Sequence, residues 1–277
     1  MPLNRRVAGL VIDWSIQTDS VLHLLDAFPE LRWLHVVKTG IDHLPQKELL
    51  RRKIQVTSSK GAYTKAVAEF AMGLIYLCAK KYLDHHADPS RSLPLWSQSL
   101  QGQNALVLGT GNIGSDVAAL VVGNGLIPLG INSDGRPVPG FARTCSWNSA
   151  TELATASAFI IDCLPLTPRT LHIVGTDFLS SLPQGACYIN VGRIETVDLA
   201  ALFAALHSGR LAHAVLDTEA ENIRVPKELR SKLLVTHHSA YATDASKLEL
   251  ARLFMHNLHA FATDTPFRGK VDLEKGY

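Results

Sequence analysis

A glycine-rich hexapeptide, GTGNIG (Gly109 to Gly114), is the clearest sign of chemistry in this 277-residue sequence. Its G-x-G-x-x-G spacing follows the apolar run ALVL and precedes SDVAALVV, which has the pattern of a helix. The first glycine permits a tight turn, Gly111 leaves room for a pyrophosphate, and Gly114 lets the helix pack closely on the strand. Amides at the start of the helix, around Asn112 and Ile113, would bind the phosphates. The motif therefore predicts a dinucleotide site, with a glycine turn that binds nothing as the alternative.

The residues about twenty positions further on, GINSDGR, bear on which dinucleotide is bound. In such folds a carboxylate at the end of the second strand bonds the 2′-hydroxyl of the adenosine ribose. Counting from the glycines places the neutral Asn132 there, with Ser133 beside it and Arg136 close behind. A neutral strand end with a nearby guanidinium favours the 2′-phosphate of NADP. Asp134 leaves NAD as an alternative, and a β-turn is the interpretation without a ligand.

Alternating strands and helices must position these residues. The order of strand, helix and strand begins with VAGLVI, SVLHLLDAF and LRWLHVVKTG, and a helical pattern extends from Tyr63 to Leu83. The alternation resumes at NALVL and continues to KLLVTHHSA, and Asp244 to His259 has the pattern of a last helix. Repeated alternation predicts an α/β protein with a doubly wound parallel sheet. The Pro- and Ser-rich segment from His85 to Gln101 is interpreted as a connection between two domains.

Composition and charge exclude several other classes of protein. Hydrophobic residues make up 47% and charged residues 19%, as in ordinary globular proteins. A formal net charge of +2, without a dense Lys/Arg run, gives no reason to expect nucleic acid as a partner. The longest apolar stretch, Ala66 to Ala79, is shorter than the ~20 residues of a membrane span, so no membrane partner is expected. Asp13 interrupts the apolar stretch near the start; we expect no signal peptide and a cytoplasmic location.

Neither the cysteines nor the adjacent histidines predict a metal site. No C-x-x-C pair is present, and the four cysteines are far apart: Cys78, Cys145, Cys163 and Cys187. We expect them to be free thiols in a reducing compartment. His237 and His238 are neighbours in a segment that is expected to be extended, where consecutive side chains point in opposite directions. Joint binding of one metal ion by this pair is therefore not expected.

Seven motifs in order resemble those of the D-isomer-specific 2-hydroxyacid dehydrogenase family. They are KTGID from Lys38, KAVAE from Lys65, GTGNIG, CLPLTPRT from Cys163, INVGR from Ile189, LDT from Leu216 and VTHHS from Val235. Each motif alone is common, but the ordered set is specific, and the resemblance extends from Val7 to the C-terminus. It implies a Rossmann-type dinucleotide-binding domain over about residues 98–241. It also implies a flavodoxin-like substrate domain split between residues 1–97 and a returning helix in 242–277, with a short first sheet.

The resemblance implies an oxidoreductase that transfers hydride between NAD(P)H and a small 2-oxo acid to give a D-2-hydroxy acid. Glyoxylate, hydroxypyruvate and pyruvate-like acids are the candidate substrates, and a homodimer formed through the nucleotide domain is implied as well. Two other interpretations remain: a dinucleotide-binding sensor or corepressor-like protein, and a non-catalytic partner subunit. A test of turnover with NADPH or NADH and a panel of 2-oxo acids separates them from the enzyme.

Arg193 and His238 are the candidate catalytic residues. Arg193 follows a predicted strand end, where ligands meet open parallel sheets, and its guanidinium can hold a carboxylate with two donors and polarise the ketone. His238 matches the family's proton donor, which protonates the carbonyl oxygen as hydride arrives. The family pairs this histidine with a glutamate, which favours the imidazolium by opposite charge. Direct counting gives Asn222 at that place; we predict Glu221 as the partner through a shifted loop, with Glu219 as the alternative.

The resemblance assigns further residues to the cofactor and to the substrate. Asp217 matches the residue that orients the nicotinamide amide. Leu164, Pro165 and Thr170 resemble the loop that covers the cofactor; the alternative is that they only end a strand and cap a helix. Gly192 is assigned to the cofactor as well. Backbone amides around Gly40 would hold the substrate carboxylate, and Lys60 with Gly61 occupies the place of a second substrate loop. Ile194 departs from the pattern, because the family commonly has glycine after its arginine.

Overall fold

The computed structural model describes residues 6–13, 16–88, 90 and 96–276. Its internal contacts divide the chain into unit 1, Met1–Thr64 with Thr243–Tyr277, and unit 2, Lys65–Ala242. We expected the first domain boundary near residue 97. The division by contacts instead places it after Thr64. The reason is that the helix α3 (Thr64–Ala79) belongs to unit 2 from its second residue on, and its Tyr76 hydroxyl donates a hydrogen bond to Asn124 of the same unit.

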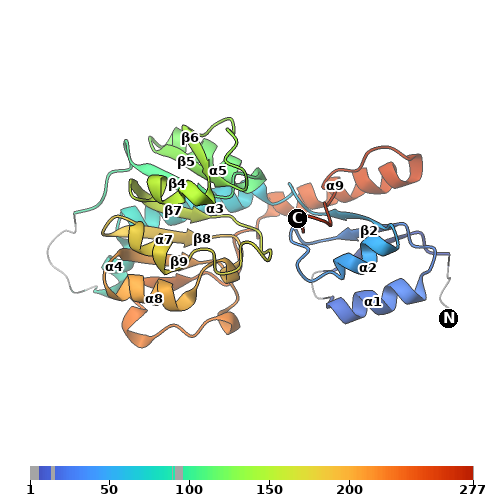
Figure 1. Cartoon of the computed structure of the whole chain (residues 1–277), viewed down its shortest axis with the longest axis horizontal. Coiled ribbons are helices and arrows are strands. Elements are labelled where there is room, and N and C mark those ends of the chain that lie inside the picture. The colour runs from blue at the N-terminus through green and yellow to red at the C-terminus, as the bar shows by residue number, and fades with distance from the viewer. Residues whose placement is uncertain (1–5, 14–15, 89, 91–95, 277) are drawn as a thin grey trace. The chain divides into compact units, whose positions relative to one another are not determined.

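In the described part of unit 2, parallel strands form one seven-stranded sheet with the order β10-β9-β8-β7-β4-β5-β6 (Figure 1). The strands are β4 (Asn104–Leu108), β5 (Ile127–Asn132), β6 (Arg143–Ser146), β7 (Ser157–Asp162), β8 (Ala186–Asn190), β9 (Leu211–Leu216) and β10 (Leu233–Val235). The chain builds outward from β4 in one direction and from β7 in the other, which confirms the predicted doubly wound topology. Ligands of such sheets bind at the carboxyl ends of the strands where the order reverses, here between β4 and β7.

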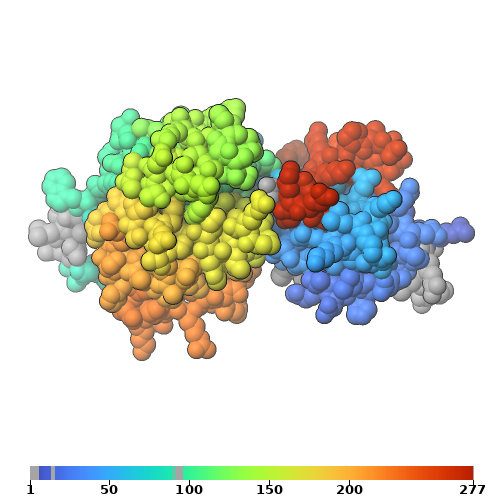
Figure 2. Space-filling view, viewed as in Figure 1, coloured from blue at the N-terminus to red at the C-terminus, as the bar shows by residue number. Residues whose placement is uncertain are grey.

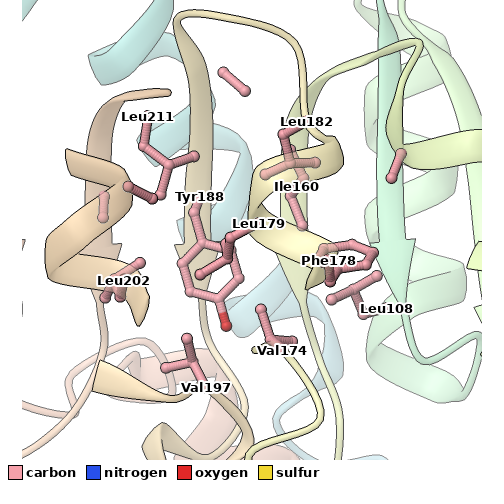
Figure 3. Packing of buried hydrophobic residues seen from close by; sticks show 14 of the residues in the cluster. Leu108, Ile160, Val174, Phe178, Leu179, Leu182, Tyr188, Val197, Leu202 and Leu211 are labelled. Carbon is pink, nitrogen blue, oxygen red and sulfur yellow. The ribbon is translucent and has the colours of Figure 1, made fainter. Parts of the chain in front are cut away.

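Helices and short 3-10 turns connect these strands. They are α4 (Tyr82–Ala87), α5 (Asn112–Gly123), α6 (Ala150–Ala154), α7 (Thr176–Ser181), α8 (Leu199–His207), η1 (Trp147–Ser149), η2 (Ile194–Thr196), η3 (Ala220–Asn222) and η4 (Lys227–Leu229). The helices α6, α7 and α8 pack on one face of the sheet, where Ile160 and Tyr188 meet Leu179 and Leu202 in the main apolar cluster (Figure 3). Figure 2 shows that side chains of α7 and α8 close over this face. The central strands are buried on both faces and therefore consist of apolar runs.

One helical pattern of the sequence corresponds to two helices. The periodicity predicted a helix from Tyr63 to Leu83, whereas α3 ends at Ala79 and α4 begins at Tyr82. Lys81 lies between them with a φ of 56°, in the left-handed region, and this conformation ends the regular hydrogen bonding. The prediction of a single helix was therefore wrong at this turn.

The described part of unit 1 contains a three-stranded parallel sheet with the order β1-β2-β3. Its elements are β1 (Gly9–Ile12), α1 (Thr18–Ala27), β2 (Trp33–Val36), α2 (Gln46–Arg51), β3 (Gln55–Ser58) and α9 (Asp244–Thr263). The C-terminal helix packs on this sheet because the Trp33 ring lies 6.5 Å from that of Phe254 and 5.2 Å from that of Phe261, between centroids. The last helix therefore returns to the first unit.

No helix within the described ranges is both long enough and apolar enough to cross a bilayer. The four cysteines are free thiols; three are buried and Cys163 is half-buried.

Candidate active site

The carboxyl ends of the parallel strands in unit 2 bring most of the sequence motifs to one edge of the sheet. β4 leads into GTGNIG, β5 into NSDGR, β7 into CLPLTPRT, β8 into VGR, β9 into DTE and β10 into THHS. These motifs are spread over about half of the chain, and the parallel strand order explains why their loops lie on the same edge.

The GTGNIG turn has the geometry that a bound pyrophosphate requires. Gly109 has a φ of 93°, and a Cβ on Gly114 would lie only 2.0 Å from the Gly109 carbonyl oxygen. Gly111 is the N-cap residue of α5 and offers no side-chain cap, and a Cβ placed on it would meet no atom within 4 Å. The helix thus starts with amides that no side chain caps, beside open space. The residues present here fit a dinucleotide.

The residues at the end of β5 form a tight polar turn. The Asn132 amide accepts a hydrogen bond from the Gly135 backbone and donates one to the Arg136 carbonyl oxygen, at 2.6 and 2.9 Å. The Arg136 guanidinium lies 2.9 Å from the Asp134 carboxylate, and both side chains are more than half exposed. Ser133 is exposed in the same turn. The candidate groups for a ribose hydroxyl and for a 2′-phosphate therefore form an ion pair with each other.

The loops after β7 and β8 touch each other. A Cβ on Gly192 would lie 2.6 Å from the Leu164 carbonyl oxygen, so only glycine permits this approach. The Thr170 hydroxyl donates a hydrogen bond to the Pro165 carbonyl oxygen at 2.6 Å and shapes the first of the two loops. The role of these two loops in covering the cofactor stays a prediction.

Arg193 is held by its backbone at the carboxyl end of β8. Its carbonyl oxygen lies 3.1 Å from Asn190 Nδ2 and 2.6 Å from the Thr196 hydroxyl, which fixes the start of η2. The next residue, Ile194, is 9% exposed and packs in the main apolar cluster. Its backbone lies outside the left-handed region, so this position does not require glycine.

The His238 imidazole is paired with Glu219. Its Nδ1 atom lies 2.9 Å from Glu219 Oε1, and Glu219 Oε2 accepts a hydrogen bond of 3.0 Å from the Asn222 amide. We predicted Glu221 as the partner of His238, but the structure has the alternative, Glu219, in this position. The physical reason is the turn η3: Glu219 precedes it in an extended conformation that directs it to the histidine, whereas Glu221 lies within the turn. Asn222, at the position found by direct counting, supports the glutamate, and the Tyr241 ring packs edge-on against the imidazole.

Asp217 fixes the loop that carries the histidine. Its carboxylate accepts hydrogen bonds from the Ser239 and Ala240 amides, at 2.8 and 3.0 Å, and from the Thr236 hydroxyl, at 2.6 Å. Sequence reasoning missed this role, because no pattern around Asp217 indicates it. The role on the nicotinamide stays a prediction.

His237 and His238 form a left-handed turn, with φ of 56° and 53°. The prediction of an extended segment was therefore wrong. The next two backbone amides, those of Ser239 and Ala240, donate hydrogen bonds to Asp217, and these bonds hold the backbone in this strained turn. Among the described residues, no group of three or more His, Cys, Asp or Glu side chains could hold an ion.

A fully buried carboxyl group lies behind the two loops. Asp162 ends β7 with no exposed surface, and burial raises its pKa to about 6 although its hydrogen bonds with Tyr188 and Thr196 act in the opposite direction. Burial also raises the pKa of the adjacent Cys163 thiol. Sequence reasoning missed Asp162; the available signal was an acidic residue at the end of the apolar run AFIID.

The candidate substrate residues of unit 1 follow β2 and β3. The Ser59 amide donates a hydrogen bond of 2.9 Å to the Lys38 carbonyl oxygen and so joins the KTGID loop, with Gly40, to the turn at Lys60. Gly61 has a φ of 99°, which favours glycine. The two predicted loops therefore lie side by side in this unit.

Comparison with known proteins identifies the family. Residues 76–240 match the family model described as "D-isomer specific 2-hydroxyacid dehydrogenase, NAD binding domain". The chain belongs to this dehydrogenase family. A glyoxylate reductase of Thermococcus kodakarensis is 29% identical over 270 residues, covering 93% of this chain and 80% of that protein. A glyoxylate/hydroxypyruvate reductase of Arabidopsis thaliana is 27% identical over 261 residues, covering 91% and 79%.

A solved structure resembles the whole described fold. The NADPH-dependent glyoxylate/hydroxypyruvate reductase of Sinorhizobium meliloti, in complex with NADP and malonate, has a TM-score of 0.79 and 27% identity, covering 100% of this chain and 88% of that one. As a member of the dehydrogenase family, the protein is an NAD(P)-dependent oxidoreductase that transfers hydride between the nicotinamide and a small 2-oxo acid. These relatives do not favour the sensor interpretation.

Proposed function

We propose that the protein reduces 2-oxo acids of the glyoxylate and hydroxypyruvate class to D-2-hydroxy acids with NADPH, and that His238 supplies the proton. The observation that carries this proposal is the His238–Glu219 pair at the carboxyl edge of the sheet that also holds GTGNIG and Arg193. The relatives named as glyoxylate and hydroxypyruvate reductases support the substrate class.

Arg193 would bind the substrate carboxylate through two parallel N–H donors and polarise the adjacent carbonyl group. The bound nicotinamide supplies the hydride. Because His238 Nδ1 is engaged by Glu219, Nε2 is the atom that donates the proton to the carbonyl oxygen. Glu219 would orient the ring and complement the imidazolium, and Asn222 would hold the glutamate in place.

The remaining assignments complete this site. Asp217 would contact the nicotinamide amide in addition to holding the histidine loop, and the contacting loops of Leu164 and Gly192 would cover the cofactor. Backbone amides near Gly40 and the turn at Lys60 and Gly61 would hold the substrate carboxylate.

The function test measures consumption of NADPH or NADH with a panel of 2-oxo acids. We expect turnover with glyoxylate or hydroxypyruvate, and a loss of more than about 10³-fold in kcat/KM for Arg193→Gln and His238→Gln with cofactor binding retained. Retained cofactor affinity shows that these variants are folded. A wild-type protein that binds the cofactor but reduces no 2-oxo acid would be a sensor instead.

The NADP preference rests on Arg136 and the neutral Asn132. Arg136→Gln should raise the KM for NADPH about tenfold, the effect of one lost charge-assisted contact, and leave the KM for NADH nearly unchanged. Asp134→Asn is the matched control: it releases Arg136 from its ion pair and should lower the KM for NADPH. Equal effects of Arg136→Gln on both cofactors would refute the preference.

We further propose a cytoplasmic homodimer. The free, mostly buried thiols suit a reducing compartment. Exposed aromatic side chains of unit 2, Trp96 at 91% and Tyr82 at 61%, suit a surface that a second copy covers. Light scattering should give twice the chain mass, and Trp96→Lys should weaken the dimer; a wild-type monomer at micromolar concentration would contradict the proposal.

A further inference from the structure

The Asp162 carboxyl group lies at the centre of a buried hydrogen-bond network between β7 and β8. Its Oδ2 atom lies 2.7 Å from the Tyr188 hydroxyl, 2.7 Å from the Thr196 hydroxyl and 3.3 Å from Asn190 Nδ2. Its Oδ1 atom accepts a hydrogen bond of 2.9 Å from the Leu164 amide. Each of these partners is a neutral group, so this buried carboxyl group is held without an opposing charge among them.

The Thr196 hydroxyl has two acceptors and one proton. Its oxygen lies 2.6 Å from the Arg193 carbonyl oxygen and 2.7 Å from Asp162 Oδ2. A hydroxyl group donates one hydrogen bond, so both contacts are satisfied only if one neighbour brings a proton. The carbonyl cannot do so, but a protonated Asp162 can: its O–H donates to Thr196, whose O–H donates to Arg193.

The surroundings of Asp162 favour the protonated form. Figure 3 shows the Tyr188 ring among the apolar side chains of the cluster, with its hydroxyl at the edge near Val174 and Val197. Burial in this region raises the pKa of Asp162 to about 6, and no charged side chain of the described residues lowers it. The titratable groups that face it are Tyr188 on β8 and Cys163, the residue directly after β7; burial raises the pKa of both, so both stay neutral.

We propose that Asp162 is a positioning residue: while protonated, it directs the Thr196 hydroxyl to the backbone carbonyl of Arg193 and so fixes the substrate-binding guanidinium. Through its other oxygen the same carboxyl group ties the Leu164 amide, on the loop that touches Gly192. One side chain thus joins the two loops beside the site. This role rests on the proposed function of Arg193.

The proposal predicts a pH dependence of substrate binding. When Asp162 loses its proton, the Thr196 hydroxyl turns to the carboxylate and the Arg193 carbonyl oxygen loses that donor. We therefore expect the KM for glyoxylate to rise about tenfold between about pH 5 and pH 8, the effect of one hydrogen bond.

Three variants of the full-length protein test this. Asp162→Asn keeps a neutral group that can donate to Thr196, so its KM for glyoxylate should stay low at all pH values. Thr196→Val should give a high KM at all pH values, and Thr196→Ser should restore the wild-type profile. Tyr188→Phe is the matched control, because Tyr188 and Thr196 lie at the same distance from the same Asp162 oxygen, whereas it is the Thr196 hydroxyl that contacts the Arg193 carbonyl oxygen; it should keep a low KM at low pH. NADPH affinity and thermal stability, measured in parallel, show whether each variant is folded.

The outcomes separate the two proposals. A wild-type protein without turnover would overturn the proposed function, and this role with it. Wild-type turnover with the same pH profile of KM in Asp162→Asn would overturn the positioning role alone. Equal increases of KM in Thr196→Val and Tyr188→Phe would also overturn it, because a purely structural network makes both hydroxyls equivalent.

Discussion

The His238 imidazole is held through one nitrogen by an exposed carboxylate, which leaves the other nitrogen for chemistry. Glu219 and His238 have exposed side-chain fractions of 54% and 37%, so solvent screens this pair and it contributes little to stability. The pair instead orients the imidazole ring and places a negative charge beside it. The Asn222 amide, 3.0 Å from Glu219, limits the positions that the carboxylate can take.

At the residue scale, Glu219→Gln keeps a hydrogen-bond acceptor on His238 but removes the negative charge. We expect kcat at neutral pH to fall about tenfold, because the protonated imidazole loses its opposite charge. The measurement is kcat against pH at saturating substrate. Glu221→Gln is the control, since the two glutamates differ by two positions and only one contacts the ring. A normal profile for Glu219→Gln together with an altered one for Glu221→Gln would restore the assignment made from the sequence.

Two glycines at the start of α5 should have different roles, because Gly114 is needed for packing and Gly111 for binding of the cofactor. A Cβ on Gly114 would lie 2.0 Å from the Gly109 carbonyl oxygen, whereas one on Gly111 would meet nothing within 4 Å. Gly114→Ala should therefore destabilise the protein by about 2 kcal/mol or more through overpacking. Gly111→Ala should reduce stability by at most about 1 kcal/mol, as at other helix caps, and weaken NADPH binding more than tenfold. Denaturant unfolding and cofactor fluorescence measure the two effects; unchanged NADPH affinity in Gly111→Ala would place the pyrophosphate elsewhere.

The strands of unit 2 could be predicted because parallel strands that are buried on both faces are continuous apolar runs, such as ALVL and ACYIN. The edge strand β6, with the sequence RTCS, has no such run and was missed. The end of α3 depends on the left-handed Lys81, and the direction of Glu219 depends on the backbone of one turn. The sequence therefore predicted the strands and the motifs that follow them. The contacts between loops depend on the backbone conformation of single turns, which the apolar pattern does not indicate.

The ends of β7 and β8 also predict how stability depends on pH. Burial raises the pKa of Asp162 from 3.8 to about 6, so the folded protein binds this proton more tightly than the unfolded chain does. The contribution is complete below about pH 4 and is lost as the pH rises through 6, which amounts to about 3 kcal/mol. Asp162→Asn lacks this titration, so its stability relative to the wild type should increase by that amount between about pH 4 and pH 8. Urea unfolding at both pH values measures the difference; parallel pH profiles would show that Asp162 titrates normally.

The residues proposed to bind the cofactor and to react, and those proposed to hold the substrate, belong to different units of the chain. The Gly-rich turn, Arg193 and His238 lie in unit 2, which is one continuous stretch of sequence, Lys65–Ala242. The proposed substrate loops at Gly40 and Lys60 lie in unit 1, which is assembled from both ends of the chain. Unit 2 contains its own apolar cluster and a complete parallel sheet.

This division predicts that residues 65–242, expressed alone, fold and bind NADPH without reducing a 2-oxo acid. Affinity should stay within about tenfold of the full chain, because the glycine turn and the loops after β5, β7 and β8 are all present. Turnover should be absent, because the backbone amides proposed to hold the substrate carboxylate are missing. Calorimetric titration with NADPH and an assay with glyoxylate measure the two properties, and the same fragment with Gly111→Ala is the control for specific binding. Turnover by the fragment would show that the loops at Gly40 and Lys60 are not needed, and that Arg193 and His238 suffice to hold the acid.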